Sequence, residues 1–159
     1  MRRSYLQNHY NISETAEGYQ FVTDNDVVYL ISFIKYPLPD ENQVFSFYSF
    51  NIDRCSIKKG QDDVRVRNTI AFVIDMFFQK HNDALMSVTD CSDSRQAVRH
   101  RLFSRWFNEL NNNYLKKIEG MIHIDDVDVF VSLLYKLDTI ESSNMISIFQ
   151  RLIDNNLYY

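Results

Sequence analysis

The sequence predicts an α+β fold in which helices pack on a mixed or antiparallel sheet. The composition is close to that of average globular domains, with 45% hydrophobic and 24% charged residues among 159. Short apolar or alternating segments lie between turn-forming residues, as is typical of strands, whereas three longer segments repeat apolar residues every three or four positions. In chain order these segments predict βββ-α-β-α-ββ-α. A chain of this length without an internal linker is expected to form a single domain, residues 1–159.

The N-terminal third of the chain contains the first three predicted strands. Residues 1–18 are polar and show no sustained period, so we expect an irregular N-terminal arm. Turn-forming residues at 24–26 separate the first two strands, and Pro37 and Pro39 interrupt the chain before the third. The pattern therefore predicts an antiparallel meander, with strands at residues 19–23, 27–34 and 44–50.

The first helix is predicted from Asp62 to about Gln79. Its core face consists of apolar residues at helical spacing, namely Val66, Ile70, Val73, Ile74 and Phe77. Phe72 and Met76 lie well outside that arc and are apolar as well. Either another part of the chain covers these two side chains, which we favour, or they are candidate interface residues for a partner or a second copy.

A strand-to-helix junction is the most distinctive feature of the sequence. The apolar run from Ala84 to Val88 predicts a buried strand that ends before Asp90. Asp93, with Gln96 three residues later, fits a capping box at the start of the next helix, whose first amides can bind a negative charge. The core face of that helix is predicted to contain Val98, Leu102, Phe103, Trp106, Phe107 and Leu110.

Two arginines share this predicted core face. Arg95 and Arg99 fall within the apolar arc, so we expect Arg99 to be largely buried, whereas Arg101 and Arg105 fall outside it and should be solvated. A buried guanidinium needs a carboxylate, a carbonyl or a bound anion as its partner. The two arginines therefore form either an internal ion pair with Asp90, Asp93 or Asp75, which we favour, or an anion site at the helix start. The candidate binding residues are Asp90, Asp93, Arg95, Gln96 and Arg99.

The C-terminal part of the chain predicts a hairpin and a final helix. Strands are expected at residues 115–124 and 127–135 around the Asp125-Asp126 turn, and a helix is the alternative for the second segment. If it is a strand, one face carries Val127, Val129, Val131, Leu133 and Tyr135. Ser142 or Ser143 can cap the final amphipathic helix, which contains Met145, Ile146, Ile148, Phe149, Leu152 and Ile153.

Several functional classes lack their sequence signatures here. The net charge of −4 argues against general affinity for nucleic acid. Three glycines cannot form the usual phosphate-binding loop, and no histidine, cysteine or acidic cluster has metal-ligand spacing, so we expect no cofactor and no metal. Cys55 and Cys91 form no disulfide pattern and favour free thiols in a reducing compartment. With no apolar leader or membrane span, a cytoplasmic protein is expected.

Several short motifs of the chain occur together in one known family. They are Asp63-Val64-Arg65-Val66, Thr69-Ile70 and Phe77-Phe78, followed by Asp90, Ser92, Asp93, Arg95, Gln96, Arg99, Arg101-Leu102-Phe103 and Trp106-Phe107. Over roughly residues 19–107 the chain thereby resembles a family of small uncharacterised bacterial proteins classed as a domain of unknown function. In that family a cysteine precedes the first aspartate of the junction and a glycine precedes its first arginine, where this chain has Thr89 and Ser94. The resemblance implies that the junction residues matter, and it implies no activity.

These features favour a cytoplasmic, non-catalytic binding module whose junction recognises a partner. The partner is expected to be a protein, a second copy of the chain or a small anionic ligand. The alternative is an enzyme of phosphoryl transfer or hydrolysis, in which Arg95 and Arg99 clamp a phosphate and Asp90 or Asp93 acts as base. The missing glycine loop, metal cluster and junction histidine favour the binding module, so no catalytic residue is assigned.

Overall fold

The computed structural model describes residues 7–38, 43–55, 63–89, 96–110 and 113–155. The chain divides into two compact units, one made of Met1–Ile34 with Phe50–His81 and the other of Lys35–Ser49 with Asn82–Tyr159. Strands β3 and β4 contribute residues to both units. The expectation of a single domain is not tested by this division and stays a prediction.

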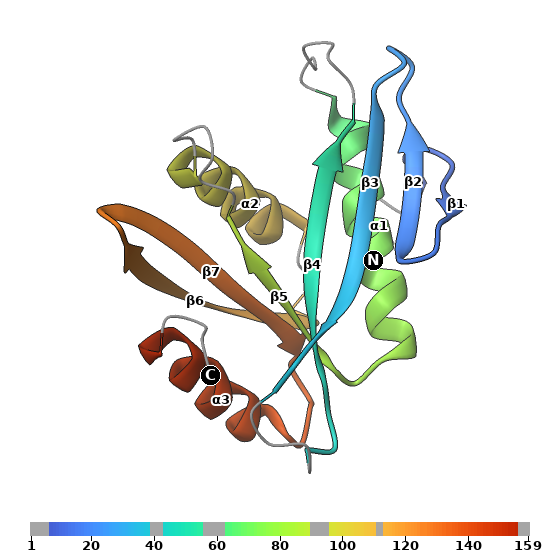
Figure 1. Ribbon diagram of the computed structural model, residues 1–159. Coiled ribbons are helices and arrows are strands. Elements are labelled where there is room, and N and C mark those ends of the chain that lie inside the picture. The colour runs from blue at the N-terminus through green and yellow to red at the C-terminus, as the bar shows by residue number, and fades with distance from the viewer. Residues whose placement is uncertain (1–6, 39–42, 56–62, 90–95, 111–112, 156–159) are drawn as a thin grey trace. The chain divides into compact units, whose positions relative to one another are not determined.

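The fold is α+β, with three helices and a seven-stranded mixed sheet in the part of the chain that the structure describes (Figure 1). The strand order is β1-β2-β3-β4-β5-β7-β6. The elements are β1 (Ser13–Glu14), β2 (Gly18–Val22), β3 (Val28–Tyr36), β4 (Phe47–Arg54), α1 (Val64–Lys80), β5 (Ala84–Val88), α2 (Gln96–Leu110), β6 (Leu115–Ile124), β7 (Val127–Lys136) and α3 (Ser142–Asp154). The predicted order is confirmed, with β1 as an additional strand inside the segment expected to be irregular. Strands β4 and β5 are parallel and are connected through α1, as parallel neighbours require.

In the first unit, α1 packs beside the antiparallel pair of β2 and β3 (Figure 1). The Phe77 ring of α1 stacks on Phe33 of β3 with the ring centres 5.1 Å apart. Of the predicted core face, Val66, Ile70, Val73 and Phe77 are buried and Ile74 is half-buried. The periodicity of apolar residues therefore identified the face of this helix correctly.

Tyr10 attaches the N-terminal segment to the start of α1. Its amide donates a hydrogen bond to Thr69 Oγ1 at 2.9 Å, and its hydroxyl donates to the carboxylate of Asp63, the N-cap residue of α1. The guanidinium of Arg65 lies 3.9 Å from the centre of the Tyr10 ring and pairs with Asp24 at 2.9 Å. Burial and the hydrogen bond to Asp63 raise the pKa of Tyr10. The segment expected to be an irregular arm is thus fixed to the first unit at residue 10.

The second unit is built around the hairpin of β6 and β7, in which Ile124 pairs with Val127. The two residues of the turn, Asp125 and Asp126, have φ angles of 49° and 63°. A two-residue type I′ turn requires this left-handed conformation, which aspartate tolerates better than most residues. The segment from Val127 is therefore a strand, and its predicted apolar face belongs to the core.

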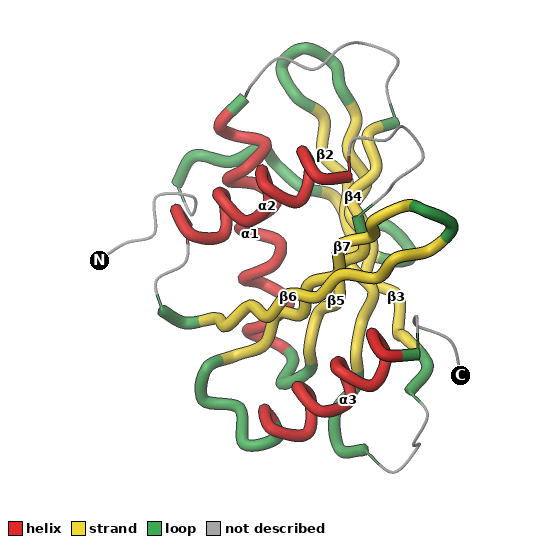
Figure 2. The backbone as a smooth tube through the Cα atoms, turned by 90° about the vertical axis from the view of Figure 1, so that its left-hand side faces the viewer, coloured by secondary structure: helices red, strands yellow, loops and turns green. Residues whose placement is uncertain are grey.

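Helices α3 and α2 lie on opposite faces of this hairpin (Figures 1 and 2). The α3 face holds the main core cluster of the second unit, composed of Phe45, Phe47, Ala84, Met86, Ile122, Val129, Val131, Leu133, Tyr135, Met145, Ile148, Phe149 and Leu152. On the α2 face, the His100 ring stacks on Phe130 of β7 with the ring centres 4.5 Å apart. The side chains of β6 and β7 alternate between these two environments, as strand geometry requires.

Several element boundaries differ from the prediction, most of all those of β4, which ends at Arg54 and not at Phe50. β4 begins at Phe47, three residues later than expected, and the side chain of Val44 is 82% exposed. The expected serine cap of α3 is wrong, because the N-cap residue is Glu141 and its side chain makes no capping hydrogen bond. β5 spans Ala84–Val88 as predicted. Among the described helices, none is long and apolar enough to cross a membrane.

Candidate functional site on helix α2

The structure describes only part of the predicted junction. Asp90, Asp93 and Arg95 lie outside the described residues, and Gln96 is the first residue of α2. Arg99 is exposed, so the prediction that it is largely buried is wrong. Whether the five junction residues form a site stays a prediction.

The side of α2 that faces the sheet is more polar than its apolar arc predicted. Leu102, Phe103, Trp106 and Phe107 are half-buried as expected, whereas Val98 is 44% exposed. His100 and Ser104, which were not assigned to the core face, are half-buried as well. The predicted core face of α2 was therefore wrong at Val98, His100 and Ser104. The reason is that α2 packs on polar side chains of β6 in addition to apolar ones.

A lysine of β6 occupies the centre of this contact. Lys117 has only 8% of its side chain exposed. Its Nζ donates a hydrogen bond to Ser104 Oγ at 2.7 Å and pairs with Glu119 Oε1 at 2.5 Å. The hydroxyl of Ser104 in turn donates to Glu119 Oε1 at 3.0 Å. Lys117 is therefore buried with both a carboxylate and a hydroxyl as partners, as a buried charge requires.

Aromatic rings and a histidine surround the same ion pair. Lys117 Nζ lies 5.3 Å from the centre of the Phe107 ring and 5.7 Å from that of Phe103, within the range of cation–π attraction. The Nε2 atom of His100 lies 3.3 Å from Glu119 Oε2. These contacts define a cluster, which we call the α2–β6 cluster, formed by His100, Ser104, Lys117 and Glu119.

The α2–β6 cluster is suited to fixing α2 in place and not to proton transfer. Burial alone raises the pKa of Glu119, but hydrogen bonds from Lys117 and Ser104 and the nearby positive charge outweigh it and lower this pKa overall. Lys117 Nζ donates its hydrogen bond to Ser104 Oγ, and an ammonium group has no lone pair to accept a proton from that hydroxyl. A serine between a cation and an ionised carboxylate is therefore a poor nucleophile.

The lowered pKa of Glu119 predicts a loss of stability in acid. Its contribution is fully present above the pKa of the unfolded chain, about 4.3, and is lost as the pH falls through the lower pKa of the folded protein. Urea unfolding of wild type and Glu119→Gln should therefore differ at pH 7, and the difference should shrink as the pH falls below about 4.3. In a Lys117→Met background the pH dependence of that difference should be reduced. A difference that stays constant down to pH 3 would contradict the assignment.

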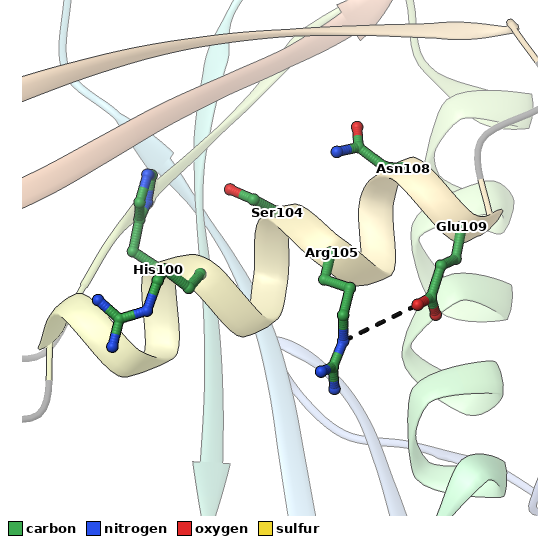
Figure 3. Close-up of a pocket in the computed structure, with 6 residues that line it drawn as sticks. His100, Ser104, Arg105, Asn108 and Glu109 are labelled. Carbon is green, nitrogen blue, oxygen red and sulfur yellow. Dashed lines mark ion pairs between the residues drawn. The ribbon is translucent and has the colours of Figure 1, made fainter.

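A pocket of about 560 Å³ lies along the same helix. Among the residues that the structure describes, its lining consists of six from α2, namely His100, Arg101, Ser104, Arg105, Asn108 and Glu109. Figure 3 shows Arg105 and Glu109 on the opposite side of the helix from His100 and Ser104. The Nε atom of Arg105 lies 3.8 Å from Glu109 Oε1 across one helical turn. The pocket therefore runs from the α2–β6 cluster to a solvent-exposed ion pair.

Arg101 and Arg105 are exposed, as predicted. Arg105 has Glu109 as a partner, whereas Arg101 has no hydrogen bond or ion pair within residues 7–38, 43–55, 63–89, 96–110 and 113–155. The two guanidinium groups are four residues apart on one helix, an arrangement in which like charges repel. The pocket is thus rimmed by two cations and one carboxylate.

The other predicted features are the interface residues Phe72 and Met76, the two cysteines and the absence of a metal site. Phe72 and Met76 are half-buried, and the Phe72 ring stacks on His9 with the ring centres 4.1 Å apart. Part of the chain therefore covers Phe72, and the use of these residues as an interface stays a prediction. Cys55 is an exposed free thiol, and Cys91 lies outside the described residues. Within the described part of the chain, no group of three or more histidine, cysteine or acidic side chains is arranged to hold a metal ion.

Comparison with known proteins identifies the family of the chain, but that family has no known activity. No curated protein and no solved structure matches the chain. A model of the family of unknown function DUF6169 matches residues 62–153, which begin just before α1 and end within α3. This match includes the junction and extends further toward the C-terminus than the resemblance at residues 19–107. The chain therefore belongs to the family of unknown function DUF6169.

Proposed function

We propose that this protein is a binding module and that the exposed side of α2 binds a negatively charged group of its ligand. The observation that carries the proposal is Arg101, an exposed guanidinium at the pocket that has no partner among the described residues. An arginine held beside a second arginine is a favourable partner for a carboxylate or phosphate, because its planar donors match those anions. Arg99, directly before the first described lining residue of the pocket, is exposed as well, but it lies two residues before Arg101 and therefore projects from another side of the helix.

An enzyme acting on a phosphate-bearing substrate is the weaker alternative. That activity would combine Arg95 and Arg99 as an anion clamp with Asp90 or Asp93 as base. The described side chains next to the pocket that could take part in proton transfer are His100, Ser104 and Glu119. Ser104 and Glu119 are engaged with Lys117, and the Nε2 atom of His100 lies 3.3 Å from Glu119 Oε2. Against the effect of burial, the hydrogen bonds from Lys117 and Ser104 lower the pKa of Glu119, which makes its carboxylate a weak general base. This favours binding over catalysis.

Titration with poly-L-glutamate, followed by NMR of the ¹⁵N-labelled protein, tests the proposal. We expect amide shifts concentrated in α2, and affinity that falls with added salt because exposed charges are screened. Arg101→Gln should weaken binding about tenfold, the effect of losing one charge-assisted hydrogen bond.

The control is Arg151→Gln, which removes one exposed positive charge from α3 and should leave binding nearly unchanged. Shifts spread evenly over the protein, or equal weakening by both substitutions, would contradict a site on α2.

A further inference from the structure

We propose that the ligand of α2 is an extended acidic segment of a partner protein, in which two acidic residues are separated by a single residue. This inference rests on the proposed function and names the chemical class of its ligand. Three features of α2 carry it: the linear arrangement of the pocket's described lining, the spacing of its two arginines, and the apolar and acidic side chains that flank them.

The described lining of the pocket follows one helix. Its described residues belong to α2, between His100 and Glu109, which corresponds to a length of about 14 Å. A site for a single phosphate brings several donors together around one point, often from a loop and a helix start. Here the lining guanidinium groups follow one another along an axis, so they match a linear ligand with several charges.

The distance between Arg101 and Arg105 determines which spacing of acidic residues in the ligand can contact both arginines. Residues four apart on a helix have Cβ atoms about 5–6 Å apart. In an extended peptide, residues i and i+2 point to the same side and are about 6.6 Å apart, whereas neighbouring residues point to opposite sides. Two acidic residues separated by one residue can therefore reach Arg101 and Arg105 together, and two adjacent acidic residues cannot.

The side chains at both ends of the arginine pair define the ends of the segment. Val98 lies about one turn before Arg101 and is 44% exposed, so it can contact an apolar residue placed two positions from the acidic pair. At the other end, Glu109 pairs with Arg105 and would repel a third acidic residue. The expected pattern is one apolar and two acidic residues at alternating positions.

Charge also favours a protein segment over nucleic acid. The sequence of α2 contains three arginines and one glutamate, whereas the whole chain has a net charge of −4. A local positive region on an acidic protein attracts a short acidic segment, whereas the many phosphates of a nucleic acid would also be repelled by the net negative charge of the protein. The complementarity is therefore with a ligand whose charge is confined to a few residues.

Two synthetic peptides of identical composition test the inference. One is the alternating peptide Leu-Ser-Glu-Ser-Glu and the other is the adjacent-acid peptide Leu-Glu-Glu-Ser-Ser, both with blocked ends. In NMR titrations of the full-length ¹⁵N-labelled chain, the alternating peptide should shift α2 amides and bind about tenfold more tightly than the adjacent-acid peptide. Arg101→Gln and Arg105→Gln should each remove most of that preference, and Arg151→Gln should retain it.

The possible results separate this inference from the proposed function. If poly-L-glutamate binds at α2 but the two peptides bind equally well, the ligand class is wrong and the binding site stands. Inorganic phosphate or a thymidine octanucleotide that binds α2 more tightly than the alternating peptide would overturn the ligand class in the same way. If none of these probes perturbs α2, the inference and the proposed function are both overturned.

Discussion

Replacing Phe149 with alanine is expected to reduce the free energy of unfolding by about 3–5 kcal/mol, the usual cost of removing a buried phenylalanine side chain. Phe149 is 2% exposed on the inner face of α3 and belongs to the core cluster of the second unit. The loss combines the apolar surface returned to water with the cavity that remains between α3 and the hairpin. Urea unfolding followed by the fluorescence of Trp106, the single tryptophan, measures the change.

The matched control for this substitution is Ile146→Ala on the same helix. Ile146 is 40% exposed, so its loss should change the free energy of unfolding by less than about 1 kcal/mol. Equal effects of the two substitutions would show that α3 does not present Phe149 to a packed core.

Replacing Gly18 with alanine is expected to destabilise the protein by about 3 kcal/mol or more, because backbone atoms cannot move aside. Gly18 of β2 pairs with Ser32 of β3, and a Cβ atom there would lie 2.0 Å from the carbonyl oxygen of Ile31. Relief of that clash requires the two strands to separate, which breaks their hydrogen bonds. Urea unfolding followed by circular dichroism measures the effect.

Gly120→Ala provides a contrast at another strand glycine. A Cβ at Gly120 would lie 2.1 Å from Cδ1 of Ile153, the end of a side chain that can rotate. We expect a cost of about 1 kcal/mol, and Ile153→Val should recover part of it because valine lacks that methyl group. If both alanine substitutions have the same effect, the clash of Gly18 with the backbone is not the cause.

Much of the fold was predictable because the periodicity of apolar residues is a local property. Val66, Ile70 and Val73 recur at helical spacing, and residues 127–135 alternate, so each segment indicated its own conformation and buried face. The two aspartates of the hairpin turn added a second local signal. The pairing of parallel β4 with β5 was not predicted, since it depends on segments far apart in the chain.

The α2–β6 cluster could not be predicted from α2 alone. The apolar arc of a helix is a guide to its buried face only when its partner surface is apolar as well, and here that surface contains Lys117. A signal was present in β6, where Lys117 and Glu119 alternate with Ile118 and are thereby placed on the face away from α3. Among the arginines of α2, the structure confirms the predicted exposure of Arg101 and Arg105 and corrects the predicted burial of Arg99, the only one of the three that belongs to the predicted site.

The path of the chain between the two units limits how the protein can be dissected. Each unit combines two separate stretches of sequence, so no single cut releases either one intact. The region matched by the family begins at residue 62, yet Phe45 and Phe47 belong to the core cluster around α3. A fragment expressed from residue 62 would lose the strand beside β5 and leave Met86 and Leu133 without these two phenylalanines. The boundary of evolutionary similarity is therefore a poor choice of boundary for a recombinant fragment.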